Sequence, residues 1–166
     1  MKFVFSIMLM SLIFTAQAGT KRIVAVFDFY DARGRTTIVG EKLSLLMFAR
    51  LSENESIKMV ERKDIDKVLK ERKLRRSGLV SRDYMSIAAL VNADYIVTGR
   101  IYDAEGGRII NLKLTKCADG KITGKVLFAD PQKKDYLEKA AAQASSYIIK
   151  KMQPKKVRPD APRVRE

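Results

Sequence analysis

The sequence predicts a single α/β domain, in which helices flank a mixed sheet of about five strands that ends in an antiparallel meander. Three observations lead to this prediction. The chain has 166 residues and is 46% hydrophobic, enough for one domain with a real core. Apolar runs of strand length alternate with segments of helical periodicity. Two turn signals, Gly106-Gly107 and Asp119-Gly120, separate the last strand-like segments.

The first half of the chain alternates strand-like and helix-like segments. Residues 21–30 form a continuous apolar run, and residues 40–54 repeat apolar side chains at helical spacing. A short strand at 57–60 precedes Asp64, a residue typical of a helix N-cap. The apolar face of that helix carries Ile65, Val68 and Leu69.

The second half begins where this helix is expected to stop. Gly78 is suited to a C-terminal cap and Ser81 to the next N-cap. The following helix has its apolar face at Tyr84, Ile87, Ala88 and Val91. Strands are expected at Tyr95–Thr98, at Ile110, Leu112 and Leu114, and at Ile122, Val126 and Phe128. The last helix carries one apolar stripe, made of Leu137, Ala140, Ala141, Ala144, Ile148 and Met152.

The two ends of the chain are expected to lie outside the domain. Residues 1–18 have a basic start, an apolar stretch and an Ala16-Gln17-Ala18 cleavage site, which predicts a secretory signal peptide. Gly19, and not cysteine, follows the cut, so no lipid anchor is expected. The domain then spans residues 19–152, and residues 153–166 form a basic, proline-rich flexible tail. We therefore expect a periplasmic protein whose mature chain has no transmembrane span.

Composition excludes several kinds of chemistry. The chain has no histidine and one cysteine, so imidazole catalysis, Cys–His catalysis and Cys/His zinc sites are not expected. No phosphate-binding or dinucleotide motif is present, and we expect no cofactor. Asp28 and Asp31 follow the first strand and are weak candidates for a ligand or metal site. Their simpler interpretation is a polar strand end with an aspartate-capped turn.

A large basic excess requires an explanation. The formal charge is +14, and residues 62–76 hold eight Lys/Arg against three acids. An exported protein meets little nucleic acid, so anionic lipid head groups, lipopolysaccharide, peptidoglycan carboxylates or acidic proteins are the expected partners. The alternative is a merely solvated helix face. The candidate contact residues are Arg62, Lys63, Lys67, Lys70, Arg72, Lys73, Arg75, Arg76 and Leu79. Cys117 is expected to be an exposed loop residue, with an intermolecular disulfide left open.

Four motifs in order carry a family resemblance. They are Ile23–Phe29 (IVAVFDF), Val60–Glu71 (VERKDIDKVLKE), Ser77–Val80 (SGLV) and Ala93–Ile101 (ADYIVTGRI). This succession resembles the CsgG-like family of curli secretion components, with its FlgO-like and LpoB-like relatives. The resemblance implies an α/β fold and a cell-envelope protein that works by protein contact. Unlike curli secretion channels, this chain has no lipidation motif and leaves no room for two membrane-spanning hairpins.

The leading hypothesis is a non-enzymatic periplasmic protein that assists outer-membrane or appendage assembly, or secretion, by protein–protein contact. The alternatives are an LpoB-like regulator of a peptidoglycan synthase, a charge-driven binder of anionic envelope surfaces, and an enzyme with a carboxylate site at Asp28 and Asp31. No catalytic residues are assigned. Whether the protein forms a homo-oligomer stays open.

Overall fold

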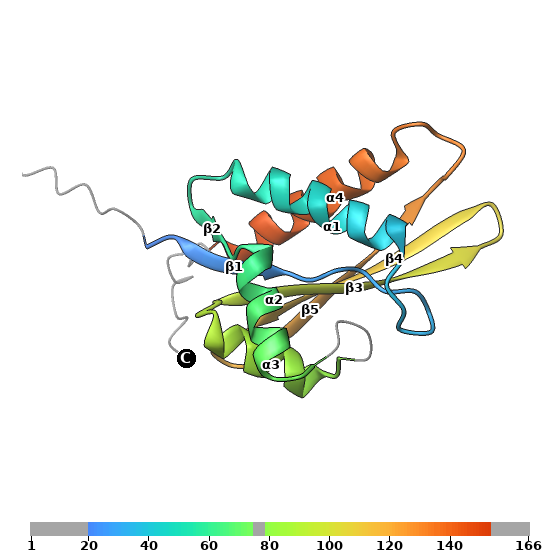
Figure 1. Cartoon of the computed structure of the whole chain (residues 1–166). Coiled ribbons are helices and arrows are strands. Elements are labelled where there is room, and N and C mark those ends of the chain that lie inside the picture. The colour runs from blue at the N-terminus through green and yellow to red at the C-terminus, as the bar shows by residue number, and fades with distance from the viewer. Residues whose placement is uncertain (1–19, 75–78, 154–166) are drawn as a thin grey trace, which may run out of the picture.

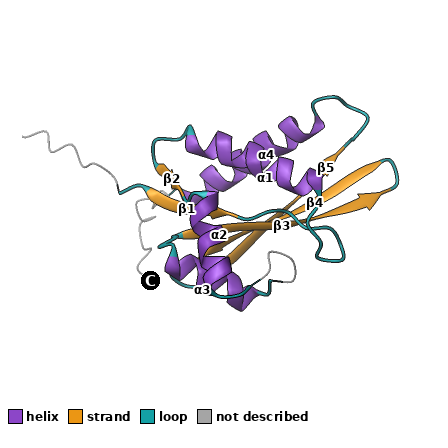
Figure 2. Ribbon diagram, in the orientation of Figure 1, coloured by secondary structure: helices purple, strands orange, loops and turns teal. Residues whose placement is uncertain are grey.

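A computed structural model describes residues 20–74 and 79–153 and confirms the predicted fold class. Over these residues the chain forms four helices and a five-stranded mixed sheet of order β2-β1-β3-β4-β5 (Figures 1 and 2). The strands are β1 (Arg22–Val26), β2 (Ile57–Met59), β3 (Tyr95–Ala104), β4 (Gly107–Lys116) and β5 (Ile122–Ala129). The helices are α1 (Ile38–Ser52), α2 (Arg62–Glu71), α3 (Ser81–Leu90) and α4 (Tyr136–Met152).

The connections explain why helices cover both faces of the sheet. β1 pairs in parallel with β2 on one side and with β3 on the other. Because parallel crossovers are right-handed, moving across the sheet in opposite directions places the connecting helices on opposite faces. Helix α1 therefore lies on one face, and α2 and α3 lie on the other (Figure 1). β3, β4 and β5 form the predicted antiparallel meander, after which α4 packs beside α1.

The two faces have separate cores. We call the face under α1 and α4 the first face; it buries Val24, Val97, Leu112 and Leu127 together with the α4 stripe. All six predicted stripe residues of α4 are buried. The second face lies under α2 and α3 and buries Ala25 and Ile96 with the apolar sides of those helices. β1 contributes to both cores, which accounts for its uninterrupted apolar sequence.

Glycine allows two close approaches in the first core. A Cβ on Gly40 would lie 1.8 Å from the Phe29 carbonyl oxygen, so the start of α1 packs directly on the backbone that follows β1. A Cβ on Gly99 would lie 2.2 Å from the Phe29 ring. Phe29 is fully buried between these two positions. The N-terminus of α1 is fixed by Thr37, whose Oγ1 accepts a hydrogen bond from the Gly40 N–H at 3.0 Å.

The boundaries of α2 and α3 differ from the predictions. α2 begins at Arg62, after Glu61, so Asp64 lies in its first turn and is not its N-cap. The helix ends seven residues before Gly78, because Lys73 adopts a left-handed φ of 52° and the Leu74 N–H bonds to the Leu69 carbonyl. α3 has Val80, not Ser81, at its N-cap; the Asp83 carboxylate accepts from the Val80 N–H at 2.9 Å. Gly78, the signal peptide and the tail from 154 onwards lie outside the described residues.

Candidate functional site

Helix α2 presents two opposite surfaces. Ile65, Val68 and Leu69 are buried against the second core. Lys63, Lys67 and Lys70 are exposed and follow one another at intervals of four and three residues, which places them on one stripe of the helix. At 100° per residue this stripe points away from the buried side chains. We call these three side chains the lysine stripe.

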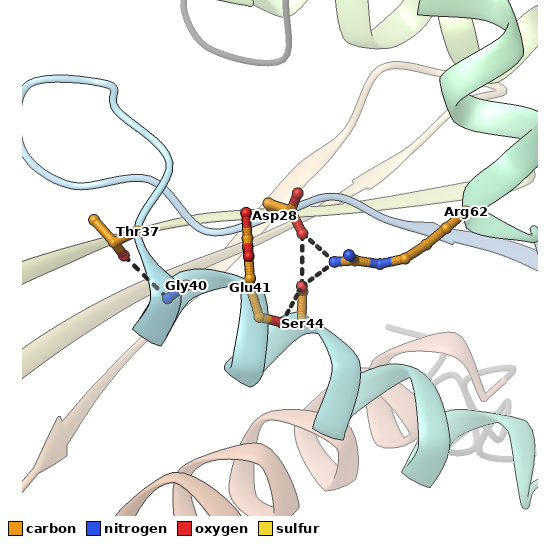
Figure 3. A network of polar contacts seen from close by, with 6 residues as sticks. All are labelled: Asp28, Thr37, Gly40, Glu41, Ser44 and Arg62. Carbon is orange, nitrogen blue, oxygen red and sulfur yellow. Dashed lines mark hydrogen bonds and ion pairs between the residues drawn. The ribbon is translucent and has the colours of Figure 1, made fainter.

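Unlike the three lysines, Arg62 directs its side chain toward the sheet. Its guanidinium donates to the carboxylate of Asp28 and to Ser44 Oγ (Figure 3). Asp28 follows β1, Ser44 lies on α1 and Arg62 opens α2, so the cluster connects the two helical layers past the end of β1. Arg62 is therefore held by the fold and is not a free contact side chain.

The cluster is buried and well bonded. Asp28 is 5% exposed and Ser44 is 1% exposed. Ser44 Oγ lies 2.8 Å from both Asp28 Oδ1 and the Glu41 carbonyl oxygen. The Arg62 guanidinium contacts both Ser44 Oγ and the Asp28 carboxylate, so the three side chains are bonded to one another. The arrangement orders and neutralises a buried charge.

Asp31 has a different set of partners. Its carboxylate accepts from the Arg33 and Arg35 backbone N–H groups at 2.9 and 2.8 Å, and from Arg35 Nε at 2.8 Å. The backbone N–H and the guanidinium of Arg35 lower the pKa of Asp31. Asp28 and Asp31 thus serve two separate networks and form no paired carboxylate site, which matches the simpler interpretation of a capped turn.

A small hollow adjoins the buried cluster. It has a volume of about 20 Å³, room for about one water molecule, and Asp28, Tyr30 and Arg62 contribute to its wall. Within residues 20–74 and 79–153, no group of three or more acidic or cysteine side chains is placed to hold a metal ion. None of the helices described is long and apolar enough to cross a membrane.

The other predicted contact residues fall into three groups. Lys63, Lys67 and Lys70 are exposed on α2, and Arg72 and Lys73 are exposed just after it. Leu79 is half-buried against the second core, so it supports the fold and offers little free surface. Arg75 and Arg76 lie outside the described residues.

Cys117 is less accessible than the sequence suggested. It is partly buried against the second core, and its backbone N–H donates to the Asp94 carbonyl at 2.8 Å. Burial, and then the nearby Asp94 carboxylate, raise the pKa of the Cys117 thiol.

Sequence reasoning missed two features. One is Ser44, which is polar at a core position of the α1 repeat; that mismatch was the available signal. The other is the exposure of Ile122, Val126 and Phe128 on β5, at 57%, 65% and 62%. Alternation within β5 is visible in the sequence, but which set faces a helix depends on the packing of distant elements.

The fold defines a known class of small α/β domains. It is similar to the LpoB C-terminal domain from Salmonella enterica, with 13% identity, a TM-score of 0.57, and 69% of this chain and 87% of that chain covered. The LpoB C-terminal domain from Escherichia coli matches at 14% identity and a TM-score of 0.54, with 66% and 83% covered. Lipoprotein GNA1162 from Neisseria meningitidis matches at 10% identity and a TM-score of 0.53, with 79% and 99% covered.

Family membership rests on a separate finding. The model of the family described as "Curli production assembly/transport component CsgG" matches residues 7–106. The chain therefore belongs to the CsgG family, as the four motifs indicated, and is related to proteins of the cell envelope. The match ends in the β3–β4 turn, so β4, β5 and α4 lie beyond it. A search of curated proteins found no match to this chain.

Proposed function

We propose that this protein is exported to the periplasm and, without catalytic activity of its own, assists assembly or secretion at the outer membrane by binding acidic envelope proteins. The observation that carries the proposal is the lysine stripe on α2. Three cations point to solvent from a helix whose other side is fixed by Ile65, Val68 and Leu69. A fixed cationic surface favours electrostatic recognition of an acidic partner.

Membership of the CsgG family supports the assembly role. The composition supports the absence of catalysis, because the chain has no histidine and one cysteine. Export is supported by the sequence of residues 1–18. The intact mass of the purified mature protein tests export directly: it should correspond to a chain that begins at Gly19.

The test of partner binding is in-cell cross-linking of a C-terminally tagged copy, followed by mass spectrometry. We expect an outer-membrane or appendage component to be captured, and the combined variant Lys63→Glu, Lys67→Glu, Lys70→Glu to lose it. The matched control reverses three exposed cations of the opposite layer, with Lys42→Glu, Arg50→Glu and Lys150→Glu. Equal losses in both variants would show that net charge, and not the lysine stripe, determines binding.

The second candidate is an LpoB-like regulator of a peptidoglycan synthase. The similarity in fold to the LpoB C-terminal domain favours it. Capture of a synthase in the same experiment, followed by stimulation of that synthase in vitro, would replace the assembly role with this one.

A further inference from the structure

None of the four helices described lies over the outer part of the second face. Strand register places Ile109, Asn111 and Lys113 of β4 on the same face as Val126 and Phe128 of β5. Arg100 and Tyr102 of β3 belong to this face as well. Among the described residues, the second core includes no side chain from β4 or β5. We call this exposed area the open patch; its members are Arg100, Tyr102, Ile109, Asn111, Lys113, Ile122, Val126 and Phe128.

The β5 side of the open patch is apolar. Ile122, Val126 and Phe128 are each more than half exposed and lie on the same face of β5, with Gly124 between Ile122 and Val126. The Phe128 ring lies directly over Gly107, where a Cβ would come within 2.3 Å of it. The ring is thus held against the sheet before any partner binds. Ile109 of β4 pairs with Phe128, which places it beside the exposed apolar side chains of β5. Exposed apolar groups of this kind are a feature of interaction sites.

Charge defines the occupant. The charged side chains that β3, β4 and β5 place on this face are Arg100 and Lys113, both exposed, and none of the three strands adds a carboxylate there. A second copy stacked face to face would bring these cations close to their counterparts. The tail, with five basic and two acidic residues in 153–166, carries the same sign. An occupant with carboxylates matches the patch.

Geometry favours a helix over a strand or a membrane. β5 is the edge strand, but the Tyr147 hydroxyl of α4 already donates to the Gly124 carbonyl at 2.8 Å, which hinders the addition of another strand.

The α2–α3 layer stands about one helix diameter, ~10 Å, above the sheet beside the patch. α3 packs on this face through Tyr84, whose ring makes an edge-to-face contact with the Phe27 ring at 4.9 Å between centroids. A flat lipid surface would meet α2 and α3 before it reached the patch.

We propose that the open patch is a docking surface for an amphipathic helix of another protein, one whose apolar stripe is flanked by Asp or Glu. The bound helix would lie beside α3 and complete the second layer as α4 completes the first. Ile122, Val126 and Phe128 would contact its apolar stripe, and Arg100 and Lys113 its carboxylates. This surface is separate from the lysine stripe, so either can fail without the other.

The first experiment places a photo-cross-linking phenylalanine analogue at Val126 in the exported full-length protein in cells. The control places it at Leu45, which is 50% exposed on α1 in the other layer. We expect a protein cross-link from position 126 only, mapped by mass spectrometry to a helical segment rich in Asp or Glu. Cross-links to lipid, to a second copy or to residues 153–166, or none at all, would overturn the proposal.

The second experiment measures binding of two designed peptides to the purified mature chain. Both have leucine at helical spacing; one carries Glu beside the stripe and the other carries Lys. We expect the Glu peptide to bind, Val126→Glu to abolish binding, and Lys113→Glu to weaken it about fivefold. Unchanged denaturation midpoints would show that both variants fold. Equal affinity for the two peptides, or tighter binding to anionic phosphatidylglycerol vesicles that Val126→Glu removes, would overturn the proposal.

Discussion

On the first face of the sheet, α1 and α4 bury side chains from all five strands, whereas on the second face α2 and α3 bury side chains from β1 and β3. The sequence of β4 contributes to this difference, since Ile110, Leu112 and Leu114 point to the first face and Asn111, Lys113 and Thr115 to the second. On β5 both faces carry apolar side chains, so there the difference arises from where the helices lie. Strand β5 contains both situations: Leu127 is 4% exposed, and its neighbours Val126 and Phe128 are more than 60% exposed.

The comparison suggests different roles for the two faces of the sheet: the first face stabilises the fold, and the open patch is available for binding. The core side chains on the first face are almost fully buried, so substitutions there change the free energy of unfolding. Ile122, Val126 and Phe128 of the open patch are each more than half exposed, so they can be changed with little effect on folding and remain available to a partner.

The largest expected effect is a difference in the free energy of unfolding between substitutions at two adjacent residues of β5. Leu127→Ala should lower the free energy of unfolding by about 3 kcal/mol, because it leaves a cavity in the first core. Val126→Ala should change it by less than about 0.5 kcal/mol. Urea denaturation of the two variants measures both values. Equal losses would mean that the two faces of β5 are equally covered, which contradicts the comparison.

The next effect tests the cluster that connects the two layers. Arg62→Ala should destabilise the protein by about 2 kcal/mol, because it leaves the buried Asp28 carboxylate without its cation. Lys63→Ala, one residue away and exposed, is the matched control and should cost less than about 0.5 kcal/mol.

A double-mutant cycle identifies the cause of that loss. Asp28→Asn removes the buried negative charge, so in its presence Arg62→Ala should cost clearly less than it does alone. Strict additivity of the two substitutions would show that Arg62 stabilises α2 in some other way than through Asp28.

How much the sequence could predict follows from the range of each interaction. The order of elements, the α4 stripe and the Asp119-Gly120 turn are local patterns, and the structure confirms them. The Asp28–Arg62 pair spans 34 residues, and no local pattern specifies it. For the same reason the basic run of residues 62–76 appeared uniform, although Arg62 is paired with the buried Asp28 and Lys63, Lys67 and Lys70 are exposed.

The predicted end of the second helix was wrong because a residue there adopts an uncommon backbone conformation. A glycine was expected to end the second helix, but Lys73 does so with a positive φ of 52°. A lysine in this conformation is strained, and nothing in its side chain signals the turn. The exposure of Val126 and Phe128 could not be predicted either, since it depends on the distance of α3 from β5.

Lys73 also offers a smaller test of the second layer. Lys73→Gly should raise the free energy of unfolding by about 0.5 to 1 kcal/mol, because glycine adopts a left-handed backbone without strain. Lys70→Gly, inside α2, should lower it by about 1 kcal/mol. Urea denaturation measures both free energies of unfolding. If α2 did not end at Glu71 with Lys73 in a left-handed conformation, the two substitutions would not have opposite effects.

The smallest effect concerns the edge of the second core. The pKa of the Cys117 thiol is raised by burial and by Asp94, and the thiolate is the form that reacts with iodoacetamide. At pH 8 the folded protein should therefore be alkylated more slowly than the chain unfolded in urea. Because the pKa is higher in the folded state, this group's contribution to stability is present below the unfolded pKa and is lost as the pH rises through the folded pKa. Equal alkylation rates in the folded and unfolded protein would mean that the Cys117 thiol is fully exposed in the fold. Cys117 would then not pack against the second core.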